Sequence, residues 1–222
     1  MFLPVGSVLS AESLDRVKSL ENDLEFVDGK LTAGWHAREV KVNRQATAGP
    51  ALRQIQRMVT DALRSHEVVR AAALPLRIVP PLLSRYAHRE RYGNHVDDPV
   101  MQTHRPVRTD LSVTVFLSDP ASYEGGELVI VTPAGEDAIK LPAGDAVLYP
   151  STTLHRVEPV TRGERFVAVT WIQSLVRDAA IRDILFDLDR ARREVFDREG
   201  KSRLFDLIAK CHANLLRHAA EP

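Results

Sequence analysis

Hydrophobic and polar positions follow different spacings in three successive parts of the chain. In the first part, a helix is predicted over about residues 11–24 because Ser10 can cap it, and a second helix starts at Pro50. In the middle part, short runs of β-branched and aromatic residues alternate with Gly and Pro turns, which predicts strands. The clearest of these strands are residues 111–117, 128–131, 146–149 and 165–171.

Apolar residues return to helical spacing after Trp171. They predict one amphipathic helix through residues 181–196 and another through 204–215, with Gly200 between them. A helical hairpin placed after the last core strand has little sheet left to cover. We therefore expect this hairpin to form a contact between copies of the chain, which would make the protein a homo-oligomer.

Short strands separated by closely spaced turns are typical of a double-sheet jelly roll, also called a double-stranded β-helix. We predict a mainly β fold with flanking helices (α+β). Residues 1–75 would form an N-terminal helical support packed on the core, 76–175 the jelly-roll core, and 176–222 a C-terminal helical appendage. With 222 residues, of which 44% are hydrophobic, the chain can bury one good core.

The charge balance argues against two classes of partner. The 30 basic residues equal the 30 acidic ones, so no overall field attracts nucleic acid or an anionic membrane.

Cys211 is the only cysteine, which excludes an intrachain disulfide and favours a reducing compartment. The first residues resemble no signal peptide, and no stretch has the composition of a membrane span. We expect a cytoplasmic protein.

The sequence His95-Val96-Asp97, together with His155, predicts an iron site. Two imidazoles and one carboxylate form the facial triad of non-haem Fe(II) oxygenases, which leaves one face of the metal open. Residues i and i+2 of an extended strand point the same way, so His95 and Asp97 can bind one ion. Closing a jelly roll would bring the strand of His155 beside that of His95.

A second motif, His88-Arg89-Glu90, has the same spacing. With 8 histidines and 30 acidic residues in the chain, about one such match is expected by chance. A strand holding His88 and Glu90 inward would place Arg89 on the opposite face, inside the strongly charged run 85–91. We expect this run to be a solvated segment beside the site.

Arg165 begins the last predicted strand and would point into an apolar interior. A buried guanidinium needs a carboxylate partner, which it binds through two parallel hydrogen bonds. The sequence is compatible with two such carboxylate partners. One is a protein acid such as Glu127 or Glu158, and the other is the distal carboxylate of 2-oxoglutarate, whose 2-oxo acid end would chelate the iron.

These motifs together resemble the PKHD-type hydroxylases, bacterial relatives of the prolyl 4-hydroxylases. The likeness covers nearly the whole chain, since it includes the N-terminal segments 28–34 and 40–43. In the core it is carried by residues 85–97, 108–117, 124–128, 142–146, 149–151, 155–157 and 163–165.

The resemblance implies a hydroxylase that depends on Fe(II) and 2-oxoglutarate. Such an enzyme couples decarboxylation of 2-oxoglutarate, to succinate and CO2, with hydroxylation of a substrate. His95, Asp97 and His155 would be the catalytic iron ligands, and Arg165 and Tyr86 would bind 2-oxoglutarate. Ascorbate is a further cofactor that the resemblance implies.

The resemblance also implies a tyrosine near the site at Tyr92, which we take as a substrate-binding position. Arg91 and Arg108 are further substrate-binding candidates because they belong to a local basic cluster around the metal motif, which is either a solvated rim or a surface that recognises an acidic or metal-chelating substrate. One departure concerns Phe116, because the oxygen-sensing prolyl hydroxylases of animals have a tyrosine at this place. Its phenol would bond the distal carboxylate of 2-oxoglutarate. Here Ser112, Thr114 or a water molecule would have to replace it.

The substrate class implied by the resemblance is a peptidyl proline or a small molecule, with a link to iron acquisition. A different class of function is a cupin-like module that binds a metal or a small ligand without oxygenase activity. Arg165 and the set of two histidines with one carboxylate favour the hydroxylase, because a binding module needs no open-faced iron.

Overall fold

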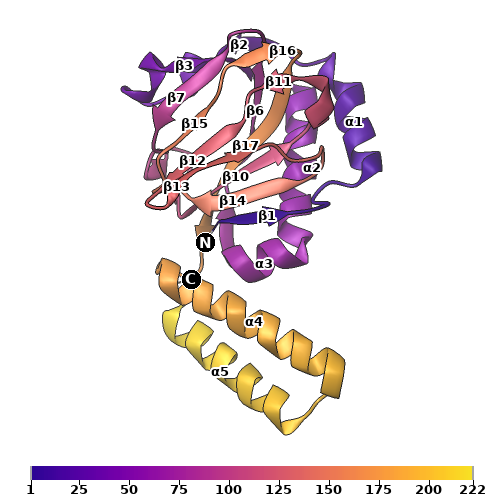
Figure 1. The fold of residues 1–222 in the computed structure, drawn as a ribbon, viewed down its shortest axis with the longest axis vertical. Coiled ribbons are helices and arrows are strands. Elements are labelled where there is room, and N and C mark those ends of the chain that lie inside the picture. Colours follow the sequence, from indigo (N-terminus) through magenta and orange to yellow (C-terminus); the bar gives the residue numbers. More distant parts are fainter. Residues whose placement is uncertain (1, 222) are drawn as a thin grey trace.

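A computed structural model describes residues 2–221 and shows two antiparallel sheets packed face to face, with a helical hairpin at one end (Figure 1). The larger sheet has the strand order β1-β14-β10-β17-β6-β4-β2, and β5 also pairs with β17. Its strands are β1 (Leu3–Val5), β2 (Phe26–Asp28), β4 (Arg44–Ala46), β5 (Pro75–Ile78), β6 (Leu82–Tyr86), β10 (Leu111–Phe116), β14 (Ala146–Pro150) and β17 (Arg165–Ser174).

The smaller sheet has the strand order β13-β12-β15-β7-β3 and faces the inner side of the larger sheet. This two-layer arrangement of antiparallel strands is the predicted jelly roll. The strands of the smaller sheet are β3 (Lys41–Val42), β7 (Arg91–His95), β12 (Leu128–Thr132), β13 (Gly135–Ile139) and β15 (His155–Val157). Two short ribbons pair β8 (Val100–Met101) with β9 (Val107–Arg108), and β11 (Glu124–Gly125) with β16 (Val160–Arg162).

Strand β10 shows how the larger sheet separates two cores. It is buried along its whole length, because helices cover one face of the sheet and the smaller sheet covers the other. Leu111, Val113 and Val115 belong to the core beneath the helices. The alternate residue Phe116 packs between the sheets, and Thr114 lines a pocket there. Because successive side chains of a strand point to opposite faces, the side chains of β10 alternate between the core beneath the helices and the space between the two sheets.

Helices α1 (Ala11–Glu21), α2 (Pro50–Ser65) and α3 (Glu67–Ala73) cover the outer face of the larger sheet (Figure 1). The predicted cap is present, since Ser10 Oγ accepts a hydrogen bond from the Ser13 backbone N–H at 3.2 Å. Helix α1 ends earlier than the predicted residue 24, because Asn22 caps it. Helix α2 buries the residues Ala51, Leu52, Ile55, Val59 and Leu63 against the sheet.

The N-terminal region supplies strands as well as the predicted helices. Strand β3 joins the smaller sheet, and β1, β2 and β4 join the larger one. These strands contain two or three residues each, which is too short for alternation to be recognised in a sequence. Short 3-10 helices complete the connections: η1 (Gly29–Thr32), η2 (Ala37–Glu39) and η3 (Pro120–Ser122).

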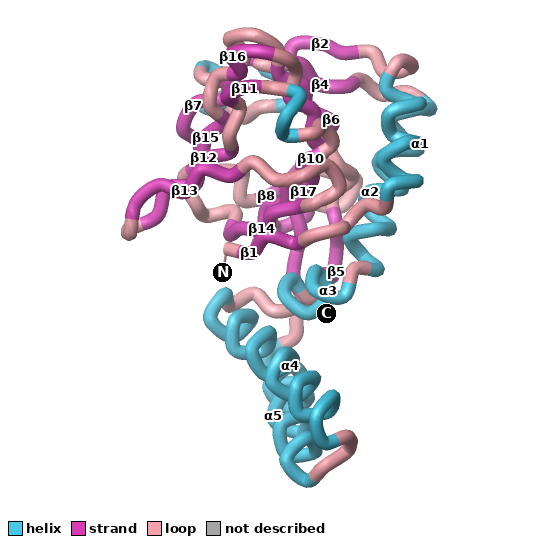
Figure 2. The backbone as a smooth tube through the Cα atoms, turned by 45° about the vertical axis from the view of Figure 1, so that its right-hand side comes forward, coloured by secondary structure: helices cyan, strands magenta, loops and turns pink. Residues whose placement is uncertain are grey.

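The C-terminal helices α4 (Ala179–Glu199) and α5 (Arg203–Ala219) form the predicted hairpin. They turn at Gly200, whose φ of 66° favours glycine. The hairpin extends away from the sheets, as the tube in Figure 2 shows. Its large apolar side chains exposed by about half are Ile184, Phe196, Leu204 and Leu207. None of the described helices is long and apolar enough to cross a membrane.

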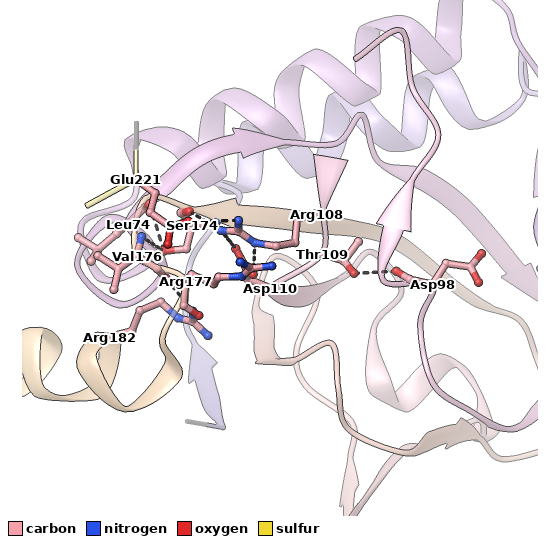
Figure 3. A network of polar contacts seen from close by, with 10 residues as sticks. All are labelled: Leu74, Asp98, Arg108, Thr109, Asp110, Ser174, Val176, Arg177, Arg182 and Glu221. Atoms are coloured by element: carbon pink, nitrogen blue, oxygen red, sulfur yellow. Dashed lines mark hydrogen bonds and ion pairs between the residues drawn. The ribbon is translucent and has the colours of Figure 1, made fainter. Parts of the chain in front are cut away.

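A polar network ties this hairpin to the end of β17 (Figure 3). Asp110 accepts a hydrogen bond from Arg108 Nε at 2.8 Å and another from the Ser174 backbone N–H at 2.8 Å. On the hairpin side, Arg182 is buried and donates to the carbonyls of residues 176 and 177, both at 2.8 Å. The charged residues at this junction are therefore used in joining the hairpin to the sheet.

Candidate metal centre

His95, Asp97 and His155 converge at the open end of the jelly roll. His95 ends β7, His155 begins β15, and the two residues are direct partners in the antiparallel ladder. Asp97 Oδ1 lies 3.9 Å from His95 Nε2 and 3.8 Å from His155 Nε2. One ligand atom from each residue lies within 4.8 Å of the others, and no other group among the described residues meets this condition for a metal.

A bulge in β7 puts Tyr92 and His95 on the same side of the sheet. His95 pairs with His155 and Tyr92 pairs with Val157, so one extra residue is present on β7. Gly93 lies in this bulge, and a Cβ atom there would come within 2.8 Å of Val40 Cβ. Without the extra residue, a strict two-residue alternation would turn Tyr92 away from the metal side.

Backbone carbonyls orient both imidazoles. His95 Nδ1 lies 2.9 Å from the Gly93 carbonyl oxygen, and His155 Nδ1 lies 2.9 Å from the Thr153 carbonyl oxygen. When each Nδ1–H donates to its carbonyl, Nε2 carries the lone pair and faces the other ligands. This arrangement fixes the tautomer that binds a metal.

Asp97 is held by a hydroxyl. Ser112 Oγ donates to Asp97 Oδ2 and lies 2.8 Å from Ser151 Oγ. Since Oδ2 is used in this way, Oδ1 is left for the two Nε2 atoms. Ser112 lies on β10 and Ser151 directly follows β14, the neighbouring strand of the larger sheet, so the hydroxyl pair connects Asp97, two residues after the end of β7, to the larger sheet.

Burial keeps the His95 imidazole neutral. Burial is the main cause that lowers the pKa of His95 to about 4, and the neighbouring His155 lowers it further. The ring of Tyr92 stacks on the His95 ring with centroids 3.6 Å apart. A neutral, fixed imidazole is the form that binds a divalent cation.

A pocket opens beside these ligands and is lined from both sheets and from the N-terminal segment. Its aromatic and polar lining residues are Thr32, Lys41, Gln45, Ser84, Tyr86, Tyr92, Thr114, Tyr149, Arg165 and Trp171, in addition to the three metal-site residues. The loop residues Ala33, Gly34 and Asp98 close one side of the mouth.

Arg165 lies in this pocket without a protein carboxylate. It is 1% exposed, and within residues 2–221 no acid lies at ion-pair distance from it. Its Nε atom has no hydrogen-bond partner. Glu158, one of the two acids considered from the sequence, pairs with Arg156 instead. The guanidinium lies 5.1 Å from the Tyr86 ring centroid and 5.7 Å from that of Phe116. Its charge is therefore available to an anion in the pocket.

Tyr86 and two further side chains of the larger sheet surround this charge. Tyr86 pairs with Arg165 in the ladder, and burial raises the pKa of the Tyr86 phenol. Tyr149 is fully buried, and burial raises the pKa of its phenol well above the ordinary value. Thr114 lines the same pocket, whereas Ser112 is used by Asp97. Of the two hydroxyls considered from the sequence, only Thr114 reaches the pocket.

The second motif does not form a metal site. His88 and Arg89 are exposed in the turn between β6 and β7, where Arg89 has a φ of 67°. His88 Nδ1 lies 2.8 Å from the Thr161 carbonyl oxygen, and Glu90 forms an ion pair with Arg44 at 3.5 Å. His88, Arg89 and Arg91 are exposed, as expected from the charge of the run 85–91, but Tyr86 of the same run is buried and Arg85 is partly buried.

Of the predicted substrate-binding residues, the structure brings only Tyr92 to the pocket. Arg91 is exposed on β7 and does not line the pocket. Arg108 lies in the junction with the hairpin, where Asp110 and Glu221 neutralise its charge. Proximity in sequence to the metal motif therefore does not bring Arg91 or Arg108 into the pocket.

Sequence reasoning assigned no role to Lys41, Gln45 or Tyr149, which all line the pocket. Segments 40–43 and 149–151 carry part of the family resemblance, but their composition does not indicate which side chains point inward. The pairing of β3 with β7 supplies that information for Lys41, since it lies opposite Tyr92.

Comparison with known families and structures gives a consistent result. The family model of the 2OG-Fe(II) oxygenase superfamily matches residues 81–173. A PKHD-type hydroxylase of Synechococcus sp. (strain JA-2-3B'a(2-13)) is 52% identical over 100% of both chains. A PKHD-type hydroxylase of Gloeothece citriformis is 49% identical, again over 100% of both chains.

Solved structures show the same fold at low identity. A Pseudomonas putida prolyl-4-hydroxylase superposes with a TM-score of 0.54 at 16% identity, covering 78% of this chain and 92% of the other. HygX from Streptomyces hygroscopicus, solved with nickel, 2-oxoglutarate and hygromycin B bound, superposes with a TM-score of 0.53 at 17% identity, covering 76% of this chain and 81% of the other.

Proposed function

Because the chain belongs to the PKHD-type hydroxylases, which are Fe(II)- and 2-oxoglutarate-dependent oxygenases, we propose that His95, Asp97 and His155 hold its iron. The single observation that carries this assignment is the convergence of the two Nε2 atoms on Asp97 Oδ1, at 3.9 and 3.8 Å. Two imidazoles and one carboxylate are the donor set that suits ferrous iron and leaves coordination positions open.

We propose that Arg165 binds the distal carboxylate of 2-oxoglutarate. Its guanidinium is buried, lacks a protein acid among the described residues and lies in the pocket beside the ligands. Tyr86, Tyr149 and Thr114 surround it with hydroxyl groups, so a phenol at position 116 is not needed to complete the binding site. The residues present thus fit the cofactor that the family requires.

When bound, iron and 2-oxoglutarate would supply the oxidising chemistry with dioxygen as the oxidant, one oxygen atom entering the succinate that forms as 2-oxoglutarate loses CO2 and the other entering the hydroxyl group of the substrate. The protein's own groups bind and orient these partners. The backbone carbonyls of residues 93 and 153 hold the imidazoles, and Ser112 holds Asp97. The partly buried Tyr92 and the buried Trp171 line the pocket with aromatic rings beside these groups.

The test is an anaerobic titration with Fe(II) and 2-oxoglutarate, followed by admission of oxygen and detection of succinate. We expect 2-oxoglutarate to bind only when the metal is present, and His155→Ala to lose both metal binding and succinate formation. Metal binding that is unchanged in His155→Ala would contradict the ligand assignment.

We propose a peptidyl proline or a small molecule as the substrate, with Tyr92 in contact with it. A structural neighbour of the chain is described as a prolyl hydroxylase in complex with a peptide fragment, and another holds hygromycin B, so this fold accepts both kinds of ligand. A role in iron acquisition is a further part of this proposal. To distinguish the two classes, the rate of succinate formation is measured with proline-containing peptides and with siderophores. Each rate is compared with the rate without a substrate.

We infer that the hairpin of α4 and α5 mediates homo-oligomerisation. Its half-exposed apolar side chains include Phe196 and Leu207, which would be costly to leave in water on an extension that packs little against the sheets. Light scattering after size-exclusion chromatography tests this inference, with Phe196→Glu as the disrupting variant. A monomer of 24.8 kDa for the unmodified chain would refute it.

Other expectations complete the proposal. Ascorbate would support turnover by keeping the metal ferrous, which is tested by adding it to single-turnover and multiple-turnover reactions. A cytoplasmic location agrees with the free, exposed thiol of Cys211, and cell fractionation tests it. Because the protein has zero net charge, we propose that it binds neither nucleic acid nor a membrane. Retention of the protein on heparin or on anionic vesicles would contradict this proposal. The organisation into 1–75, 76–175 and 176–222 is tested by removing the last segment and measuring metal binding.

A further inference from the structure

Lys41 is a buried cation in the pocket that the proposed chemistry does not use. It belongs to β3, pairs with Tyr92 of β7 and is 5% exposed. It lines the same pocket as the metal-site residues. Its strand also lies outside residues 81–173, the part of the chain that the superfamily model matches. Lys41 therefore belongs to a wall of the pocket formed by a segment that precedes the part matched by the superfamily model.

The ammonium group of Lys41 has only neutral partners at hydrogen-bond distance. Nζ donates to Thr32 Oγ1 at 2.9 Å and to Gln45 Oε1 at 3.4 Å, and it lies 5.1 Å from the Tyr92 ring centroid. Within the described chain, no carboxylate comes within ion-pair distance of it. An ammonium has three N–H donors, so one donor is left for another acceptor.

Acidic residues act on Lys41 only at longer range. Asp97 and Asp28 both favour its charged form, but burial outweighs them and lowers the pKa of Lys41 to about 8. At neutral pH the side chain therefore keeps its proton in a mostly apolar surrounding. Asp98, which also lines the pocket, is exposed to solvent at the mouth. A buried charge of this kind is stabilised when a ligand brings an opposite charge.

The charges of the loaded site leave Lys41 unbalanced. A ferrous ion, the Asp97 carboxylate, the Arg165 guanidinium and the two carboxylates of 2-oxoglutarate cancel to zero. Lys41 then contributes one positive charge that neither the metal nor the cosubstrate neutralises. The remaining acid of the lining, Asp98, is exposed to solvent and does not pair with Lys41 among the described residues. This residual charge lies beside Tyr92, whose ring stacks on the ligand His95, and so borders the space where a substrate must lie.

We propose that Lys41 binds a carboxylate of the substrate and so makes this hydroxylase selective for an acidic substrate. The inference rests on the proposed function, since it names the substrate class of the same pocket. The segment that precedes Lys41 supports it, because Thr32 and Gly34 line the pocket while Trp35 is 80% exposed at the surface nearby. A substrate with a carboxylate and an apolar portion would be complementary to this wall.

Two other roles for Lys41 predict different results. If Lys41 only braces Thr32 and Gln45, replacing it should lower stability without changing ligand preference. If it binds 2-oxoglutarate itself, replacing it should weaken 2-oxoglutarate binding. The variants are therefore Lys41→Met, which keeps the aliphatic stem, Lys41→Arg, which keeps the charge, and Lys30→Met. Lys30 is an exposed lysine of the same segment, so Lys30→Met controls for the loss of one charge.

The experiment uses the full chain loaded with Zn(II) and 2-oxoglutarate, which bind without oxygen chemistry. Binding of three matched probe pairs is measured by ligand-observed NMR. Each pair differs in one charge: acetate and acetamide, benzoate and benzamide, and N-acetylproline and N-acetylprolinamide. The dissociation constant of 2-oxoglutarate is measured for every variant first, and a thermal melt verifies that each variant is folded.

We expect the acid of at least one pair to bind the unmodified protein at least tenfold more tightly than its amide. This preference should fall about 10- to 100-fold in Lys41→Met, as one charge-assisted hydrogen bond is lost, and persist in Lys41→Arg and Lys30→Met. Equal binding of acid and amide in every pair, or the absence of probe binding, would overturn the inference. So would an acid preference that Lys41→Met retains, or a weaker 2-oxoglutarate affinity in that variant. Failure of the unmodified protein to bind 2-oxoglutarate with metal would instead refute the proposed function.

Discussion

Replacement of Arg165 by methionine has two separate expected effects, one on the stability of the apoprotein and one on the binding of 2-oxoglutarate. In the apoprotein, Arg165 is 1% exposed and has no carboxylate partner among the described residues. Methionine has a similar length and fills much of the same volume. Removing the uncompensated charge should therefore leave the apoprotein as stable as before or more stable, in contrast to most substitutions of buried residues.

The same substitution should strongly weaken 2-oxoglutarate binding. Loss of one partner of a buried, hydrogen-bonded charge pair costs about 2–4 kcal/mol, which corresponds to roughly a 30- to 1000-fold higher dissociation constant. At a 2-oxoglutarate concentration of about 100 times the original dissociation constant, ligand binding stabilises the unmodified protein by about 2.7 kcal/mol. For a chain of this size, that is a rise in Tm of about 5–10 °C.

The assay is thermal unfolding of the Zn(II)-loaded protein with and without 2-oxoglutarate, together with calorimetric titration. In Arg165→Met, the ligand-induced rise in Tm should shrink to about 3 °C or less. Arg85→Met is the matched control. Arg85 lies on the neighbouring strand, forms an ion pair with Glu21 at 2.6 Å and does not line the pocket. This control should lower the Tm of the apoprotein and keep the full ligand-induced rise. A 2-oxoglutarate affinity within threefold of the original in Arg165→Met would refute the reasoning.

Three further predictions concern the ligands and Lys41. His155→Ala should abolish stoichiometric Zn(II) binding in equilibrium dialysis, and retention of tight binding would exclude His155 as a ligand. Ser112→Ala should lower metal affinity about 10- to 100-fold because it releases Asp97, while Ser151→Ala, which keeps that bond, should have a smaller effect; equal effects would contradict this role. Because burial lowers the pKa of Lys41 from 10.5 to about 8, against the opposing effect of Asp97 and Asp28, the unfolded chain binds more protons between these pH values. The free energy of unfolding of the unmodified protein, relative to Lys41→Met, should then rise from pH 8 to 10.5 and stay constant below pH 8, and denaturation curves that show no such rise would contradict the burial of a charged Lys41.

The sequence predicted the main elements because their patterns are local. The cap at Ser10, the first turn at Pro50 and the strand of residues 111–117 each depend on neighbours within a few positions, and the structure contains all three. The metal-site group was also predictable, since two residues of the His95 motif lie close in sequence and a jelly roll brings His155 beside them.

Features that depend on long-range packing could not be predicted from the sequence. The bulge in β7 depends on how β15 pairs with it, and no local pattern predicts its position. Arg108 lies near the metal motif in sequence, but its pairing with Asp110 directs it to the hairpin junction. Lys41 and Tyr149 face the pocket only because of their partners in the two sheets.

The main-chain support of the two imidazoles has an evolutionary consequence. Both Nδ1 atoms bond carbonyl oxygens, which every amino acid possesses, so exchanges of the Thr153 side chain cannot delete the acceptor. Asp97 differs, because its support is the hydroxyl of Ser112, which a single codon change can remove. Genetic drift can therefore exchange the Thr153 side chain and keep the support of His155, whereas inactivating lesions in this part of the site should concentrate on the serine that steadies the carboxylate.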